Sequence, residues 1–265
     1  DQTGRQQWEA VSRALSRLDN RLPYVVAQGN HDIGHITATD RHTIMPEIIH
    51  PERNILFEKH LVATCENWQG VHAMGNSAYE FEDKAWGKML VITFEFAPRD
   101  EAIEWAKKLT TSEQYKNHKV IILVHSWLDT DGTRRAKEGY TLRPCNWPEA
   151  VWQKLVYPSK NICMVLCGHT GDDPDIKVGD VKGTNYQPTT SYRVDKAADG
   201  RDIPQMMFNS QQGDGDWNGN GGDCWLRILE FKPDGKTIGV RTFSPLFAIS
   251  QLTQNLAGRT AEYDQ

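Results

Sequence analysis

The sequence predicts a mixed α/β fold in a single domain spanning residues 1–265. Up to Cys167, short apolar runs typical of strands alternate with segments whose apolar residues recur at helical spacing. From about residue 204 the apolar runs are all strand-like and are separated by turn residues, so the last part is expected to be β-rich. The sequence shows no internal repeat and no Ser/Gly-rich or Pro-rich linker that would divide the domain.

The first elements are expected in the order helix, strand, excursion. Gly4–Leu18 has apolar residues at 3-4-3 spacing, which predicts an amphipathic helix. Leu22–Ala27 is a short apolar run and predicts a buried strand. Arg41–Gly75 has no clear period and predicts a long excursion with short helical pieces; a connection of that length is usually functional.

The middle of the chain alternates between the two element types. Strands are predicted at Met89–Phe96, Lys119–Val124 and Asn161–Cys167, and helices at Pro98–Leu109 and Glu149–Val156. A polar, Gly-rich stretch follows at Asp172–Asp202. The β-rich part then contains predicted strands at Pro204–Asn209, Cys224–Phe231 and Thr237–Phe243, with a hairpin turn at Pro233–Lys236.

Composition excludes several classes of protein. A net charge of −5 provides no basic field for nucleic acid. No apolar stretch approaches the roughly 18 residues of a membrane span. Five cysteines without a CxxC motif argue against a zinc knuckle and a full disulfide framework, and the redox compartment stays open. Cys163 and Cys167 lie in an apolar run and are expected to be buried free thiols.

Three apolar runs end in a polar cluster that contains histidine. The first leads into Gly29-Asn30-His31-Asp32, the second into His125-Ser126 and the third into Gly168-His169-Thr170-Gly171. Each cluster alone could be an ordinary turn. In an open α/β sheet, however, the carboxyl ends of strands form the ligand-binding edge, so these distant positions are expected to meet. Imidazole nitrogen and amide oxygen suit Zn, Mn, Fe and similar ions.

These motifs resemble those of the calcineurin-like metallophosphoesterases. The resemblance covers nearly the whole chain, and the ending Gly221–Pro245 is similar to one bacterial branch of that family. It implies a two-sheet sandwich flanked by helices, with two divalent metal ions at one sheet edge. It also implies hydrolysis of a phosphomonoester or phosphodiester of small size by a metal-activated hydroxide. Branches with this ending are often exported, which favours a periplasmic or extracellular protein.

The resemblance assigns a role to each motif residue. Asn30, His125 and His169 match ligands of the second metal. His31 matches the histidine that contacts phosphate and acts as general acid, and Asp32 matches the residue that orients the His31 imidazole.

The chain departs from the family pattern in two places. The final family motif is GHxH, but Gly171 stands where its second histidine is expected, and only Asp172 or Asp173 could replace it. The first two family motifs, which include the aspartate that bridges both metals, are not in the sequence, and Asp1 more plausibly follows that aspartate than provides it. A central strand is therefore expected to be missing beside Leu22–Ala27, and the chain alone is expected to have little phosphatase activity.

Other interpretations stay open. Asp214–Gly219 fits the first half of a calcium loop, but Trp225 stands where the loop needs Glu, which favours a plain Gly/Asn-rich loop. In the resembling family this region borders the cleft, so Trp217 is a candidate substrate contact. Ser126 directly follows His125, and neighbours on an extended chain point apart, which argues against a Ser/His hydrolase.

The main alternative to an enzyme is a non-catalytic metal- or ligand-binding protein on the same fold. It is favoured by Gly171 and by the lack of a bridging aspartate.

Overall fold

The structure is a computed structural model that describes residues 4–171, 189–211, 224–249 and 262–264. Its helices are α1 (Gly4–Leu15), α2 (Met45–Ile48), α3 (Phe57–His60), α4 (Asp100–Thr111), α5 (Pro148–Val151) and α6 (Pro245–Ile249). A 3-10 turn covers Pro51–Arg53, and a π-helical turn, Trp152–Val156, continues α5.

The strands form two sheets. The larger sheet contains β1 (Leu61–Glu66), β2 (His72–Asp83), β3 (Gly87–Thr93), β4 (Lys119–Leu123), β5 (Ile162–Cys167), β6 (Thr189–Lys196) and β7 (Asp202–Asn209). The smaller sheet contains β8 (Leu226–Phe231), β9 (Ile238–Phe243) and β10 (Glu262–Asp264). Their orders are β1-β2-β3-β4-β5-β7-β6 and β10-β9-β8. The predicted mixed α/β class is confirmed.

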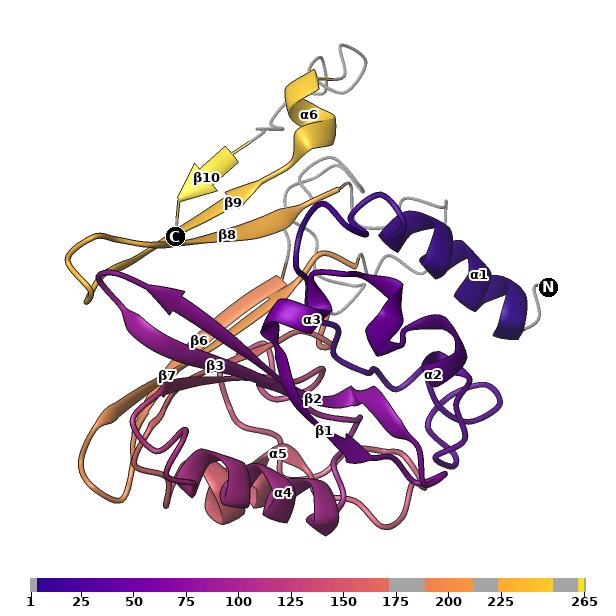
Figure 1. The fold of residues 1–265 in the computed structure, drawn as a ribbon, viewed down its shortest axis with the longest axis horizontal. Coiled ribbons are helices and arrows are strands. Elements are labelled where there is room, and N and C mark those ends of the chain that lie inside the picture. Colours follow the sequence, from indigo (N-terminus) through magenta and orange to yellow (C-terminus); the bar gives the residue numbers. More distant parts are fainter. Residues whose placement is uncertain (1–3, 172–188, 212–223, 250–261, 265) are drawn as a thin grey trace.

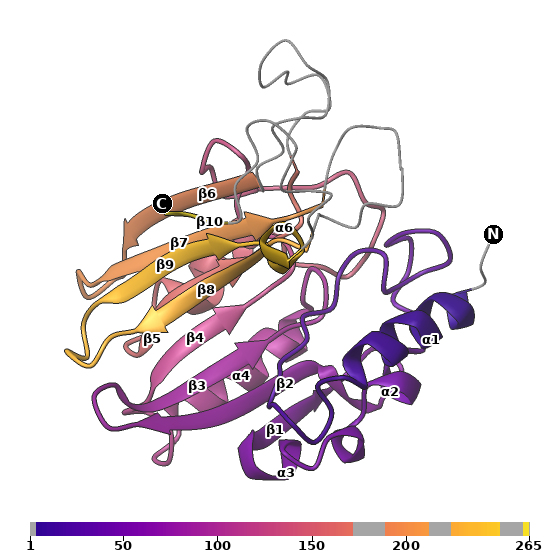
Figure 2. The ribbon, with the colours of Figure 1, turned by 90° about the horizontal axis from the view of Figure 1, so that it is seen from above.

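Four neighbouring strands at the centre of the larger sheet are parallel. β3 pairs with β4, β4 with β5 and β5 with β7 in parallel register, whereas β1, β2 and β6 pair antiparallel. Figure 2 shows these strands side by side, from β1 at the bottom to β6 at the top. The carboxyl ends of β3, β4, β5 and β7 therefore lie at the same edge of the sheet.

One face of the parallel strands packs against α4 and α5, which lie together on one side of the sheet in Figure 1. Alternate strand residues point to this face because side chains on a strand alternate between its two sides. Burial of each such side chain contributes about 1.5–3 kcal/mol. The completely buried members from β3, β4 and β5 are Leu90, Ile92, Val120, Ile122, Ile162 and Val165.

The smaller sheet lies on the face of the larger sheet that is opposite to α4 and α5 (Figure 1). Trp86, in the turn between β2 and β3, connects the two sheets. Its ring packs edge-on against Phe231 with centroids 4.9 Å apart, and its Nε1–H donates to the Lys232 carbonyl at 2.7 Å. Arg227 of β8 also lies over the Phe208 ring of β7, 5.0 Å from its centroid.

Most predicted elements are confirmed with shifts of a few residues at their ends. The first helix ends at Leu15 instead of Leu18, and the turn at Pro233–Lys236 joins β8 to β9 as expected. All five cysteines are free thiols. Cys167 is buried, as expected, and burial raises its pKa to about 12, whereas Cys163 is partly exposed. Among the described helices, none has the length and apolar character needed to cross a bilayer.

The prediction of a strand at Leu22–Ala27 is wrong. Residues 23–29 are extended but belong to no strand of the described residues, and the Val26 carbonyl accepts a hydrogen bond from Thr93 Oγ1 of β3 at 3.3 Å. The apolar side chains of this segment pack on a cluster around Met45, Phe57 and Tyr79. The segment is also less buried than predicted, since Leu22 is 55% exposed and residues 24–27 are only partly buried. Its apolar character therefore indicated packing and not a hydrogen-bonded strand.

Four strands were not expected from the sequence, namely β1, β2, β6 and the short β10. β1 and the start of β2 lie in the excursion that was predicted to hold only short helical pieces, and β6 lies in the polar stretch after β5. In β2 the central residues Asn76 and Ser77 are polar yet completely buried, so the usual alternation is lost. In β6 the alternating apolar residues Tyr192 and Val194 are 60% and 43% exposed.

We expect Trp86→Ala to lower the free energy of unfolding by about 2 kcal/mol, less than for a fully buried Trp because this ring is half-buried. Backbone amides of β8 and β9 should also exchange faster with deuterium, since the contact between the sheets is lost. Trp68→Ala is the matched control because Trp68 is 51% exposed, and it should change stability by less than about 0.5 kcal/mol. Equal effects of the two substitutions would contradict the role of Trp86.

Candidate functional site

Three side chains from distant parts of the chain converge at the carboxyl edge of the parallel strands. His125 lies just after β4, His169 follows β5, and Asn30 lies in the turn after the extended segment. His125 Nε2 is 2.8 Å from Asn30 Oδ1 and 3.0 Å from His169 Nδ1. The sequence predicted that these three residues would converge, and the structure confirms it. Their roles as metal ligands stay a prediction.

Asn30 is presented by a tight turn, Gly29–Asp32. Asp32 N–H donates to the Gly29 carbonyl at 3.2 Å, and Gly29 N–H donates to Asp32 Oδ2 at 2.6 Å. Burial raises the pKa of Asp32, although the bond from Gly29 opposes this shift. The backbone of the Gly-Asn-His-Asp sequence thus forms an ordinary turn, and this turn presents the Asn30 and His31 side chains.

His31 lies at the exposed side of this turn, next to the three converging residues. Its Nδ1 is 3.2 Å from the Ile36 carbonyl, to which it can donate. The sequence-based expectation was that Asp32 would orient the imidazole. In the structure the Asp32 carboxylate is directed to Gly29 N–H instead, because the turn folds it back on the chain. The predicted general-acid role of His31 is not tested by this contact.

Arg41 anchors the loop that follows the turn. Its guanidinium donates to the carbonyls of Phe96 at 3.2 Å, Ala97 at 2.6 Å and Pro144 at 3.0 Å, and it lies 3.7 Å from the Glu95 carboxylate. Arg41 is only 5% exposed. Arg41 therefore connects its own loop to two others around the site. One is the loop after β3, which contains Phe96 and Ala97, and the other is the loop between β4 and α5, which contains Pro144.

His169 has an uncommon backbone conformation. Its φ is +71°, and Thr170 N–H donates back to the Gly168 carbonyl at 2.9 Å, as in a γ-turn with a left-handed central residue. A non-glycine residue with such a φ is kept only where its surroundings hold it in place. Here Gly168 N–H donates to the His125 carbonyl at 2.9 Å, and Asn209 Nδ2 donates to the His169 carbonyl at 3.1 Å.

A carboxylate that was not predicted from the sequence completes the cluster. Glu138 Oε2 lies 3.0 Å from His169 Nε2, and Oε1 accepts a hydrogen bond from the Ser126 hydroxyl. Burial opposes ionisation of Glu138, but the hydrogen bonds from His169 and Ser126 outweigh it and lower its pKa. Glu138 lies in the long loop between β4 and α5, where no period or motif singles out one acid.

Tyr140, from the same loop, was also missed. Its hydroxyl accepts a hydrogen bond from Asn30 Nδ2 at 2.8 Å, so the amide oxygen of Asn30 is directed to His125. The only signal in the sequence is that two residues of this loop, Glu138 and Tyr140, stand at i and i+2, a spacing that puts side chains on one side of an extended chain.

The surroundings keep His125 neutral. Burial and the neighbouring His169 lower the pKa of His125 to about 4. The ring packs edge-on against Phe96, with centroids 5.8 Å apart, and lies directly against the backbone of Gly29. At neutral pH the imidazole is therefore uncharged, and its single N–H is on Nε2, which donates to Asn30 Oδ1 because an amide oxygen can only accept.

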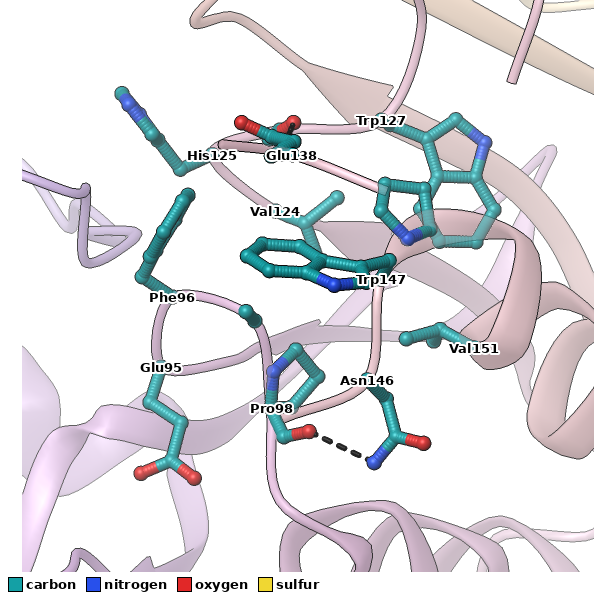
Figure 3. A pocket seen from close by; sticks show the side chains of 13 residues that line it. Glu95, Phe96, Pro98, Val124, His125, Trp127, Glu138, Asn146, Trp147 and Val151 are labelled. Atoms are coloured by element: carbon teal, nitrogen blue, oxygen red, sulfur yellow. Dashed lines mark hydrogen bonds between the residues drawn. The ribbon is translucent and has the colours of Figure 1, made fainter. Parts of the chain in front are cut away.

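Behind His125 is a small cavity of about 20 Å³, large enough for one water molecule. Figure 3 shows Phe96 and Trp147 beside His125 and Glu138 at this cavity. Phe96 also contacts the ring of His169, with centroids 6.0 Å apart. The Phe96 ring therefore packs against both imidazoles and restricts their movement.

The three converging atoms are of the types that divalent transition metals take as ligands. Asn30 Oδ1, His125 Nε2 and His169 Nδ1 are oxygen and nitrogen donors of the borderline type, and each is within 3.0 Å of a neighbour in the group. Among the described residues, no three His, Cys, Asp or Glu side chains are arranged to hold a metal. The cluster described here differs because its third donor is the amide oxygen of Asn30. Gly171 provides no donor, and Asp1, Asp172, Asp173 and Trp217 lie outside the described residues.

The chain is similar to one curated bacterial protein over most of its length. It is 23% identical over 240 residues to the "Uncharacterized protein YvnB" of Bacillus subtilis (strain 168). The matched region is 90% of this chain and 16% of that protein. The chain thus spans about a sixth of the length of this relative, whose name states no activity. No family model and no solved structure matches the chain.

We expect Gly29→Ala to displace His125. A Cβ at this position would lie 3.0 to 3.2 Å from three atoms of the imidazole ring, so the ring or the turn must shift. Overpacking of this kind typically costs about 1–3 kcal/mol of stability. Gly75→Ala is the control, because its Cβ would meet Gln28 at an ordinary 3.6 Å. Crystal structures and unfolding curves of both variants check this, and an unmoved His125 ring in Gly29→Ala would refute it.

We expect the His125 imidazole to titrate with a midpoint near pH 4 in the metal-free folded chain. Its folded-state pKa is below the unfolded value of about 6.5, so the unfolded chain binds the proton more readily. This histidine should therefore reduce stability progressively as the pH falls from about 6.5 to about 4. An NMR titration of the ring protons measures the midpoint. A value near 6.5 would show that the site is more open to solvent than described.

Proposed function

We propose that this chain carries the active-site edge of a metal-dependent phosphoesterase of the calcineurin-like type, which hydrolyses a small phosphomonoester or phosphodiester. The observation that carries the proposal is the convergence of Asn30, His125 and His169, with their donor atoms 2.8 and 3.0 Å apart. The motif order along the chain supports it, since an Asn-His pair, a lone His and a Gly-His pair follow successive apolar runs.

The arrangement of the sheets also supports this type of fold. A smaller sheet lies on one face of the larger sheet, α4 and α5 lie on the other, and the site lies at the carboxyl edge of parallel strands. A two-sheet sandwich flanked by helices is the architecture implied by the motifs. The proposal therefore explains both the position of the site and the second sheet.

Asn30, His125 and His169 would hold one divalent ion, such as Mn, Fe or Zn, and in this type of enzyme a second ion lies beside it. When bound, the ions supply Lewis acidity that stabilises the negative charge of the reacting phosphoryl group. The protein keeps His125 neutral by burial, so its Nε2 could act as a ligand once the proton that now bonds to Asn30 Oδ1 has left that nitrogen. Tyr140 holds the Asn30 amide so that its oxygen is directed to the same point.

His31 is assigned the proton transfer. It is exposed at the mouth of the site, and its Nδ1–H can remain bonded to the Ile36 carbonyl at 3.2 Å. A His31 that is protonated on both nitrogens would then give its Nε2 proton to the leaving oxygen and become neutral, as a water-derived oxygen bonds to phosphorus and the bond between phosphorus and the leaving oxygen breaks. This assignment needs the substrate phosphate between His31 and the three converging residues.

A second candidate function is binding without catalysis on the same fold. Gly171 favours it, because it provides no side chain at the position where a further ligand is expected, and the described residues offer a single group of three donors. Such a protein would bind a metal or a phosphate-containing ligand and would not turn it over.

The test measures metal content and turnover together, in the complete gene product and in the 265-residue chain. We expect His125→Ala to lose the bound Mn²⁺, because a site with one ligand fewer loses affinity. We expect His31→Ala to keep the metal and to lower turnover of p-nitrophenyl phosphate or its diester by about 10²–10⁴-fold, as for loss of a general acid. The 265-residue chain should bind metal but hydrolyse little.

The outcomes separate the two candidate functions. Metal binding with no turnover by the complete product on either ester would favour the binding protein. Loss of metal in His31→Ala would make His31 a ligand and contradict the assignment of the motif. His60→Ala is a suitable control, because His60 is the last residue of α3 and bonds to the Glu80 carbonyl at 2.8 Å, so it takes no part in the proposed site.

A further inference from the structure

We infer that Glu138 is a positioning residue that fixes the tautomer of His169 and so directs the Nδ1 lone pair to the point shared with His125 and Asn30. This inference rests on the proposed function, since it names a residue that prepares the same site. It concerns the loop between β4 and α5, from which no functional residue was expected.

The contact between the two side chains carries the argument. Glu138 Oε2 lies 3.0 Å from His169 Nε2, the ring nitrogen that does not approach His125. A carboxylate can only accept hydrogen bonds, so Nε2 must carry the proton. Because a neutral imidazole has one N–H, Nδ1 then has the lone pair, and Nδ1 is the atom that lies 3.0 Å from His125 Nε2.

The carboxylate is itself held in place. The Glu138 side chain is 2% exposed, against 16% for His169, so the acid lies beneath the imidazole. Its other oxygen accepts from the Ser126 hydroxyl, and Ser126 directly follows His125. One chain of contacts therefore joins the residue after β4, the loop acid and the histidine after β5. Ion pairing for stability alone would not require a buried acid aligned with Nε2 of a residue whose backbone is left-handed.

A carboxylate behind a metal-binding histidine has a general purpose. It fixes the ring orientation and makes the ligand nitrogen more basic, and its loss typically weakens metal affinity by about 10–100-fold. Ser126 should contribute less, because it positions the acid and does not touch the histidine.

Two substitutions at Glu138 separate its effect from simple damage to the fold. In Glu138→Gln the side-chain volume is kept and the amide oxygen can still accept from Nε2–H, so the tautomer should persist and metal affinity should fall only several-fold. In Glu138→Ala the acceptor is lost, so His169 should populate both tautomers and Mn²⁺ affinity should fall by about 10–100-fold. Glu113→Ala, at a position 90% exposed, should leave both properties unchanged.

Two measurements give the result. Long-range proton–nitrogen NMR correlations of the metal-free chain report which ring nitrogen of His169 carries the proton, and calorimetric titration with Mn²⁺ reports affinity. A mixed tautomer in Glu138→Ala, with Nε2–H in the wild type, supports the inference even if the protein hydrolyses no ester. Unchanged tautomer and affinity in Glu138→Ala, when the wild type binds metal and hydrolyses ester, overturns the inference and leaves the proposed function intact.

Discussion

The parallel pairing of β4 with β5 is the constraint on which the site depends. Leu123 pairs with Leu166 near the ends of these strands, so the chain leaves both strands at one edge of the sheet. His125 and His169 follow within three residues of those partners, and the bond from Gly168 N–H to the His125 carbonyl continues the pairing past the strand ends. A shift of register by one residue would send the side chains to the opposite face and separate the two imidazoles.

Asn30 reaches the cluster by different means, because the segment before it forms no strand. Its position is set by buried polar contacts, chiefly those of Arg41 with the carbonyls of Phe96, Ala97 and Pro144. Tyr140 then turns the Asn30 amide, and Glu138 of the same loop contacts His169. Two structural devices therefore meet at one point. A regular sheet places the histidines, and an irregular network of loops places the amide and the groups behind it.

The sequence predicted what depends on local pattern. His125 and His169 were found because apolar strands end at polar residues, and Asn30 because a glycine-containing turn follows an apolar run. Leu22–Ala27 was assigned to a strand because apolar residues look alike whether they pair in a ladder or only pack. Glu138 and Tyr140 were missed because a long loop has no period, and their importance comes from residues that the sequence places far away. The strands β2 and β6 were missed because buried Asn76 and Ser77 and exposed Tyr192 invert the usual alternation.

The wide sequence separation within the cluster has a kinetic consequence. The contact of Asn30 with His125 spans 95 residues, and its contact with Tyr140 spans 110 residues. Closing such long loops costs chain entropy before the contacts contribute any favourable free energy. Contacts of high sequence separation therefore slow folding. The sheet can form from nearer neighbours, such as β2 with β3, long before this edge is complete. The binding edge is therefore expected to be the last part of the molecule to assemble and an early one to open during unfolding.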